Sequence, residues 1–172
     1  MLSIDSSDDV LAWVGAIGLA VVCRTALIVD ARFAHPPARR TLADLAAAGP
    51  RLDELSPGRG GVATIFSGGL GEETLGEIVD RLASSWPAVV VRGSVSFLPL
   101  VPYRPIYPGA LQPERASAAV WQPVAFLPAA PLPGRIMPRL GRGATLAMLH
   151  GRSPGRGRWV NAWREVWGLP WA

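Results

Sequence analysis

Glycine-rich loops are the first candidates for chemistry in this sequence, because such loops often hold the phosphates of a nucleotide. Ser67–Gly71 (SGGLG) follows an apolar run and precedes a helical one, which is the right context for a phosphate loop. The segment lacks the GxGxxG spacing, Glu72 and Glu73 follow it, and the chain has no lysine to grip a phosphate. We interpret it as a tight turn, with a ligand loop as the alternative.

Side chains for acid–base, nucleophilic or metal chemistry are few. Asp30 ends an apolar run, and either His35 or His150 could form an acid–base pair with it. Cys23 lies in an apolar segment, where cysteine is usually a small buried hydrophobe. One cysteine excludes an internal disulfide and a multi-cysteine zinc site. We predict no catalytic residue, no metal site and no cofactor, and keep a small enzyme centred on Asp30 and a histidine as an alternative.

The charge of the chain is low in amount and uneven in position. Of the 172 residues, 49% are apolar and only 17% charged, which leaves apolar surface for a partner to cover. All 17 basic residues are arginine, a composition typical of GC-rich genomes. Residues 1–86 carry a net charge of −4 and residues 87–172 a net charge of +8. The basic half could bind phosphates or carboxylates, or pair with the acidic half.

The elements that must position these residues alternate between strands and helices. We predict strands at 1–4, 26–29, 62–66, 87–92 and 120–127, and helices at 10–22, 40–48, 72–85, 135–140 and 158–167. Residues 144–150 read as a strand or a helix, and we favour a strand because glycines flank the run. This order predicts an α/β fold, with a mostly parallel sheet flanked by helices in a Rossmann-like or P-loop-like topology. We expect residues 1–172 to form a single domain.

The first strand–helix junction, where such folds usually bind phosphate, carries Asp5, Asp8 and Asp9 and no glycine. Ala26–Arg32 (ALIVDAR), Val62–Gly69 (VATIFSGG), the helix at 72–84, Pro87–Gly93 (PAVVVRG) and Leu146–Pro170 follow it in order. Together these segments resemble a degenerate member of the MinD/ParA-type deviant P-loop ATPases. In that resemblance Asp30 matches the first acid of the pattern, Arg32 stands where a second acid is common, and Arg92 replaces the Walker B aspartate. The resemblance implies the family's fold and pairing with like partners, and the missing Walker motifs argue against ATP hydrolysis.

The C-terminal helix at 158–167 is rich in tryptophan. Trp159, Trp163 and Trp167 are spaced four residues apart and share one face, and Trp171 follows the helix. Arg158 and Arg164 border that face. Because tryptophan and arginine dominate binding hot spots, we predict that these residues contact a partner. The alternative is that the face packs on the sheet.

Ten of the 17 prolines lie between Pro99 and Pro138, so we predict a proline-rich insert at about 97–138 made of loops, short turns and an edge strand. In its first part the prolines recur every three residues, the repeat of polyproline II. Tyr103, Arg104 and Tyr107 would project from this helix toward a partner. The alternative is a stiff loop that covers a sheet edge.

These features predict a non-catalytic binding subunit that docks on a related ATPase or on a second copy of itself. The alternative is a nucleic-acid-binding accessory protein that uses the arginine-rich half. No secretory signal precedes the apolar run at 10–23, which is shorter than the ~20 residues that cross a bilayer. We therefore expect a cytoplasmic protein that has no membrane partner.

Overall fold

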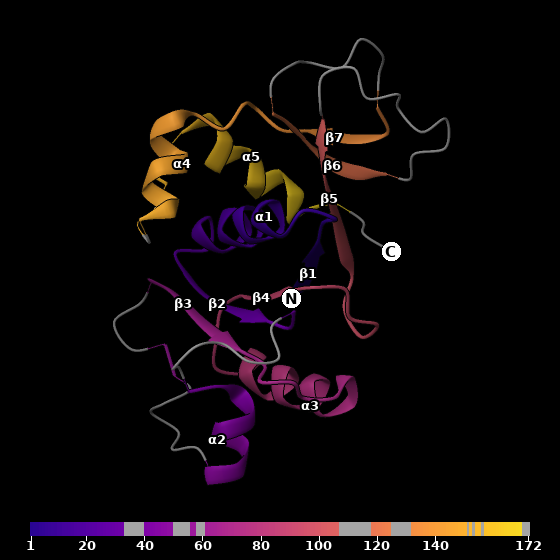
Figure 1. Ribbon diagram of the computed structural model, residues 1–172, viewed down its shortest axis with the longest axis vertical. Helices are drawn as coiled ribbons and strands as arrows, with labels where there is room; N and C mark the ends of the chain where they lie inside the picture. The colour runs from indigo at the N-terminus through magenta and orange to yellow at the C-terminus, as the bar shows by residue number, and fades with distance from the viewer. Residues whose placement is uncertain are drawn as a thin grey trace.

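In the part of the chain that the structure describes, seven parallel strands form one sheet in the order β3-β2-β4-β1-β5-β6-β7 (Figure 1). The computed structural model describes residues 1–32, 40–49, 56–57, 61–106, 118–124, 132–150, 152, 154–155 and 157–169. The strands are β1 (Leu2–Asp5), β2 (Thr25–Asp30), β3 (Gly61–Phe66), β4 (Val89–Arg92), β5 (Leu100–Ile106), β6 (Ala119–Pro123) and β7 (Gly134–Ile136). All six strand pairings are parallel, which confirms the predicted α/β fold class.

Helices cover both faces of the sheet. On one face lie α1 (Asp9–Val21), α4 (Arg142–Leu149) and α5 (Arg158–Val166); on the other lie α2 (Leu42–Ala48) and α3 (Glu72–Ala83) (Figure 1). Because side chains of a strand alternate between faces, β2 sends Ile28 into the core under α1 and Leu27 and Val29 into the core under α2 and α3. None of the helices in the described ranges has the length and hydrophobicity needed to cross a bilayer.

Residues next to α1 determine where this helix begins and ends. Asp8 caps α1, with a side-chain oxygen accepting the Leu11 N–H at 2.9 Å. The predicted helix at 10–22 is confirmed, and it is buried along most of its length. After its end, Arg24 adopts a left-handed backbone (φ 63°) that turns the chain into β2.

Where the proline-rich stretch at 97–138 is described, it forms strands inside the sheet, whereas we predicted loops, short turns and an edge strand; the strand predicted at 120–127 is present as β6. Residues 100–102 of β5 pair with β1, and residues 103–106 pair with β6. Each half of β5 is therefore bonded along one side only. That arrangement explains how Pro102 and Pro105, which lack an N–H, are accommodated in a strand with neighbours on both sides.

Two further assignments were wrong. The predicted helix at 135–140 is replaced by the short strand β7 and by irregular backbone, and the predicted strand at 144–150 is the helix α4. A short apolar run between glycines does not distinguish strand from helix by periodicity. In α4, Met148 is buried against the α1 core while Leu146 is 45% exposed, the one-sided burial of a covering helix.

Candidate functional site

The first candidate site is the switch point of the sheet, where the connections of the chain begin to run toward the opposite edge. The chain leaves β1 toward β2 on one side and leaves β4 toward β5 on the other, although β1 and β4 are neighbours. Open parallel sheets bind ligands at the carboxyl ends of such a strand pair. Here these ends bring together Asp5 from β1, Asp30 from β2, Arg92 from β4 and Asp9 from the first turn of α1.

Arg92 lies at the centre of this cluster and is buried. Its side chain is 3% exposed and that of Asp30 is 1% exposed; their atoms Nη1 and Oδ2 are 2.5 Å apart. The other guanidinium nitrogen, Nη2, donates to the Asp9 carbonyl at 3.2 Å and lies 3.3 Å from Asp9 Oδ1. The guanidinium carbon also lies 5.5 Å from the centre of the Trp13 ring, within cation–π range. Ion pairs and packing together hold Arg92 in one position.

Arg32 closes the outer side of the cluster. Its Nη1 lies 2.8 Å from Asp9 Oδ1 and 3.4 Å from Asp5 Oδ1, and it donates to the carbonyl of Ser6 at 3.0 Å. Two guanidinium groups therefore face three carboxylates, which leaves the cluster with a formal charge of −1. Such a site repels a phosphate at the position where the fold would bind one.

The cavity that described residues line beside the cluster is small. A cavity of about 140 Å³ is lined by Asp5, Ser6, Ser7, Leu100, Pro102, Tyr103 and Arg104. Ligand pockets are usually about 300–1,000 Å³, so this cavity is too small for a nucleotide. The described part of the chain also has no group of three histidine, cysteine, aspartate or glutamate side chains placed to hold a metal ion.

Two alternatives from the sequence concern an acid–base pair at Asp30 and a ligand loop at 67–71. Both carboxylate oxygens of Asp30 accept hydrogen bonds, one from Arg92 and one from the backbone N–H of Arg32 at 3.1 Å. His150 caps the end of α4 and is exposed, and His35 lies outside the described residues. Gly68 has a positive φ (75°) and packs on Thr41, where a Cβ would lie 2.7 Å from the Thr41 Cβ, as in a close-packed turn.

The tryptophan face of α5 points inward. Trp159 is 4% exposed and Trp163 is fully buried; they pack edge-to-face, with ring centres 5.6 Å apart. Trp163 lies so close to α1 that a Cβ at Gly18 would overlap its indole ring. Half-buried Trp167 donates its indole N–H to the Leu19 carbonyl at 2.9 Å. The structure thus places Trp163 and Trp167 against α1, and Trp159 against Trp163 and Gln122 of β6. The face is packed inside the chain, mainly on a helix and only at Trp159 on the sheet, and Trp171 lies outside the described residues.

The proline-rich stretch also sends its tyrosine inward. Tyr103 is fully buried and donates its hydroxyl proton to Gln122 Oε1 at 2.7 Å, and Trp159 Nε1 donates to the same oxygen at 2.8 Å. Burial raises the pKa of Tyr103 well above its usual range, and the neighbouring indole N–H of Trp159 opposes the rise. Of the other predicted contact residues, Arg104, Arg158 and Arg164 are exposed, and Tyr107 lies outside the described residues.

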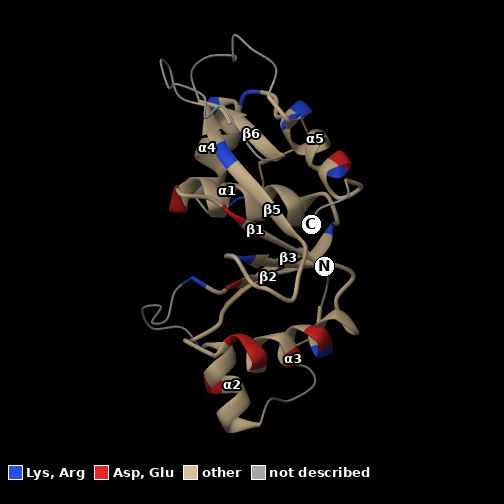
Figure 2. Cartoon of the chain, turned by 90° about the vertical axis from the view of Figure 1, so that its right-hand side faces the viewer, with Lys and Arg blue, Asp and Glu red and all other residues tan. Residues whose placement is uncertain are grey.

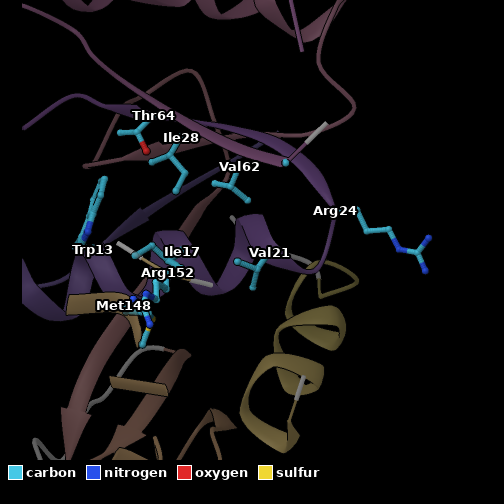
Figure 3. Close-up of a pocket in the computed structure, with 10 residues that line it drawn as sticks. Trp13, Ile17, Val21, Arg24, Ile28, Val62, Thr64, Met148 and Arg152 are labelled. Atoms are coloured by element: carbon cyan, nitrogen blue, oxygen red, sulfur yellow. The ribbon is translucent and has the colours of Figure 1, made fainter. Parts of the chain in front are cut away.

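A second, larger cavity lies along β3, the strand at one edge of the sheet. It is an open groove of about 370 Å³ between β3 and α1 (Figure 3). Its lining is mostly apolar: Trp13, Ile17, Val21, Arg24, Ile28, Gly61, Val62, Thr64, Met148 and Arg152. Sequence reasoning missed this groove, because it exists only where β3 is the last strand of the sheet.

Comparison with known proteins adds no relative to this picture, since no family model, curated protein or solved structure matches the chain.

Sequence reasoning also missed the pairing of Arg92 with Asp30. Its signal was present, because two opposite charges each follow a buried strand, but the sequence does not say which strands are neighbours.

Proposed function

We propose that this chain is a non-catalytic protein-binding subunit of the degenerate MinD/ParA type, working in the cytoplasm without a nucleotide. The observation that carries the proposal is the closed cluster at the carboxyl ends of β1, β2 and β4. Arg92 is bound there by Asp30 and Asp9, and a phosphate would have to displace it into a site of net negative charge. A fold closed at this point can bind and position partners without using ATP.

A calorimetric titration with Mg²⁺ and ATP tests this proposal. We expect no saturable binding up to millimolar nucleotide. The titration is repeated at high salt, because exposed arginines attract ATP weakly and salt screens that attraction. Binding in a buried site is screened much less and would remain. A micromolar Kd that survives high salt would show that the cluster opens and that the proposal is wrong.

Among the predicted contact residues, the exposed arginines of α5 and Arg104 of β5 remain available to a protein partner. Arg158 and Arg164 are exposed while the tryptophans between them are buried. We expect the Arg158→Ala/Arg164→Ala variant to lose partners that the wild-type chain retains in co-purification. Arg81→Ala on α3 is the matched control, because it removes an exposed arginine from the opposite layer. Equal recovery with all three proteins would argue against contact through α5.

The division of charge supports nucleic-acid binding as the second candidate. Figure 2 shows a group of acidic residues on α2 and α3, and basic residues around α4, α5 and in β5. Among the described residues of that basic half, Arg104, Arg142, Arg158 and Arg164 are exposed. This candidate predicts binding to DNA or RNA that weakens steeply with salt. An absence of any mobility shift at low salt would dispose of it.

A further inference from the structure

The outer edge of β3 is unpaired within the part of the chain that the structure describes. β3 ends the sheet and is six residues long, whereas β7 at the other end has three, and no strand in the described ranges pairs with its outer side. Proteins usually protect edge strands with charged residues, prolines or bulges, since an open edge invites another strand. The β3 sequence, GVATIF, contains neither a charged residue nor a proline. Nothing in its composition prevents a further strand from pairing there.

The face of β3 beside α1 is also open and apolar. Val62 and Thr64 pair with Ala26 and Ile28 of β2, and all four side chains point toward α1. Ile28 is buried, but Val62 remains 40% exposed because α1 covers β3 only in part. The groove of about 370 Å³ lies in the space between β3 and α1, and Ile17 and Val21 of α1 form its wall. A strand added beside β3 would place every second side chain along this groove.

The two ends of the groove carry positive charge. Arg152 lies beside Met148 and Trp13 at one end, and Arg24 points outward at the other (Figure 3). None of the described lining residues is acidic, and no ion pair in the described ranges involves either arginine. Arg24 also keeps its side chain in a left-handed backbone (φ 63°), a conformation that glycine adopts without strain.

From this geometry we infer that β3 and its groove bind an extended, acidic and apolar segment of a partner protein. The segment adds a strand to the sheet, inserts alternate apolar side chains into the groove and directs carboxylates to Arg24 and Arg152. Strand addition of this kind takes its affinity from main-chain hydrogen bonds and its specificity from alternate side chains. A second copy paired through β3 fits less well, because it would add arginines to a groove that has no acid. The inference rests on the proposed binding role and names the partner's chemistry.

Selection from a phage-displayed library of random peptides tests the inference, with segments of about ten residues, the upper range of strand length. Purified wild-type protein is the target. We expect enriched peptides to be acidic, free of proline and apolar at alternate positions. Peptides without this pattern, or no enrichment at all, would overturn the inference.

Variants in β3 locate the binding. Val62→Glu adds a charge to the groove at an exposed position, and Ala63→Glu adds the same charge to the same strand on the opposite face. We expect the enriched peptide to bind Ala63→Glu as it binds wild type, and to bind Val62→Glu at least about tenfold more weakly. Equal affinity for both variants would place the peptide elsewhere and refute the inference.

Arg24→Gly separates a structural role of this arginine from a binding role. The substitution removes the side chain from a backbone that suits glycine, so the thermal midpoint should stay constant or rise while the acidic peptide binds more weakly. Unchanged peptide affinity would contradict the charge argument. Sedimentation of wild type and Val62→Glu adds one more outcome: a wild-type dimer that Val62→Glu dissociates would identify a second copy as the occupant and overturn the inference. None of these results depends on the nucleotide titration or on the arginines of α5.

Discussion

Replacing Arg92 with methionine is the sharpest test of the buried cluster. The substitution keeps most of the side-chain volume but leaves the Asp30 carboxylate, 1% exposed, without the guanidinium that lies 2.5 Å away. Removing one partner of a buried ion pair typically costs about 3–5 kcal/mol, because the remaining charge stays buried without compensation. A small domain has only about 5–15 kcal/mol of stability in total, so Arg92→Met should be severely destabilised.

Urea unfolding followed by circular dichroism measures this loss. With a urea m-value of about 2 kcal/mol/M, a loss of about 4 kcal/mol moves the unfolding midpoint down by about 2 M. The double variant Arg92→Met/Asp30→Asn should lose clearly less than the two single variants combined, because it no longer buries an unpaired charge. The deviation from additivity measures the coupling between the two side chains.

Arg32→Met is the matched control, because it removes the same group from the same cluster at a more exposed position. The Arg32 side chain is 31% exposed, and its partners Asp5 and Asp9 are 34% and 60% exposed. Ion pairs of this exposure contribute about 0–1 kcal/mol, so we expect a loss of about 1 kcal/mol or less. If Arg92→Met costs no more than Arg32→Met, or if the Arg92 and Asp30 losses simply add, the reasoning from burial is wrong.

Three further predictions concern buried side chains. Trp163→Ala should lose about 3–5 kcal/mol of unfolding free energy in urea, because its indole is fully buried. Gly18→Ala should lose about 1–3 kcal/mol, because the added Cβ would overlap that indole. A Trp163→Ala protein of wild-type stability would contradict the packing against α1. Because burial raises the pKa of Tyr103, the tyrosine contributes stability that is complete below its unfolded pKa of about 10 and is lost as the pH rises above that value. The thermal midpoint of the wild type should therefore fall as the pH rises above that value, and the midpoint of Tyr103→Phe should fall less. Parallel pH curves for the two proteins would exclude this tyrosine as the cause. Burial also raises the pKa of the Cys23 thiol, so its reaction with a disulfide reagent at pH 8 should be slow in the folded protein and fast in urea, and equal rates would refute that burial.

Much of the fold could be predicted because its first half follows local rules. Helix α1 begins where Asp8 caps it, and α3 begins and ends within two residues of the predicted bounds. The second half could not be predicted in the same way. Pro102 and Pro105 argue against a strand by local rules, but β5 accommodates them because β1 and β6 pair with different halves of it.

The candidate site was predicted only in its parts. Arg92 was recognised as standing in place of an acid, and the acidic junction at 5–9 was recognised as unsuited to phosphate. Their combination into one buried cluster required the order of β2, β4 and β1. Likewise, the common face of Trp159, Trp163 and Trp167 follows from helical spacing, but only the position of α1 shows that the face is covered.

The sequence by itself determined the alternation of strands and helices, the absence of a lysine P-loop and the acids at the first junction, because these depend on residue types and short spacings. The tertiary structure alone decided which strands are neighbours. That order joined Arg92 to Asp30 across 62 residues, and it left β3 at the edge with an open groove. Pairing of distant segments depends on burial and hydrogen bonding across the whole sheet, which no local pattern specifies.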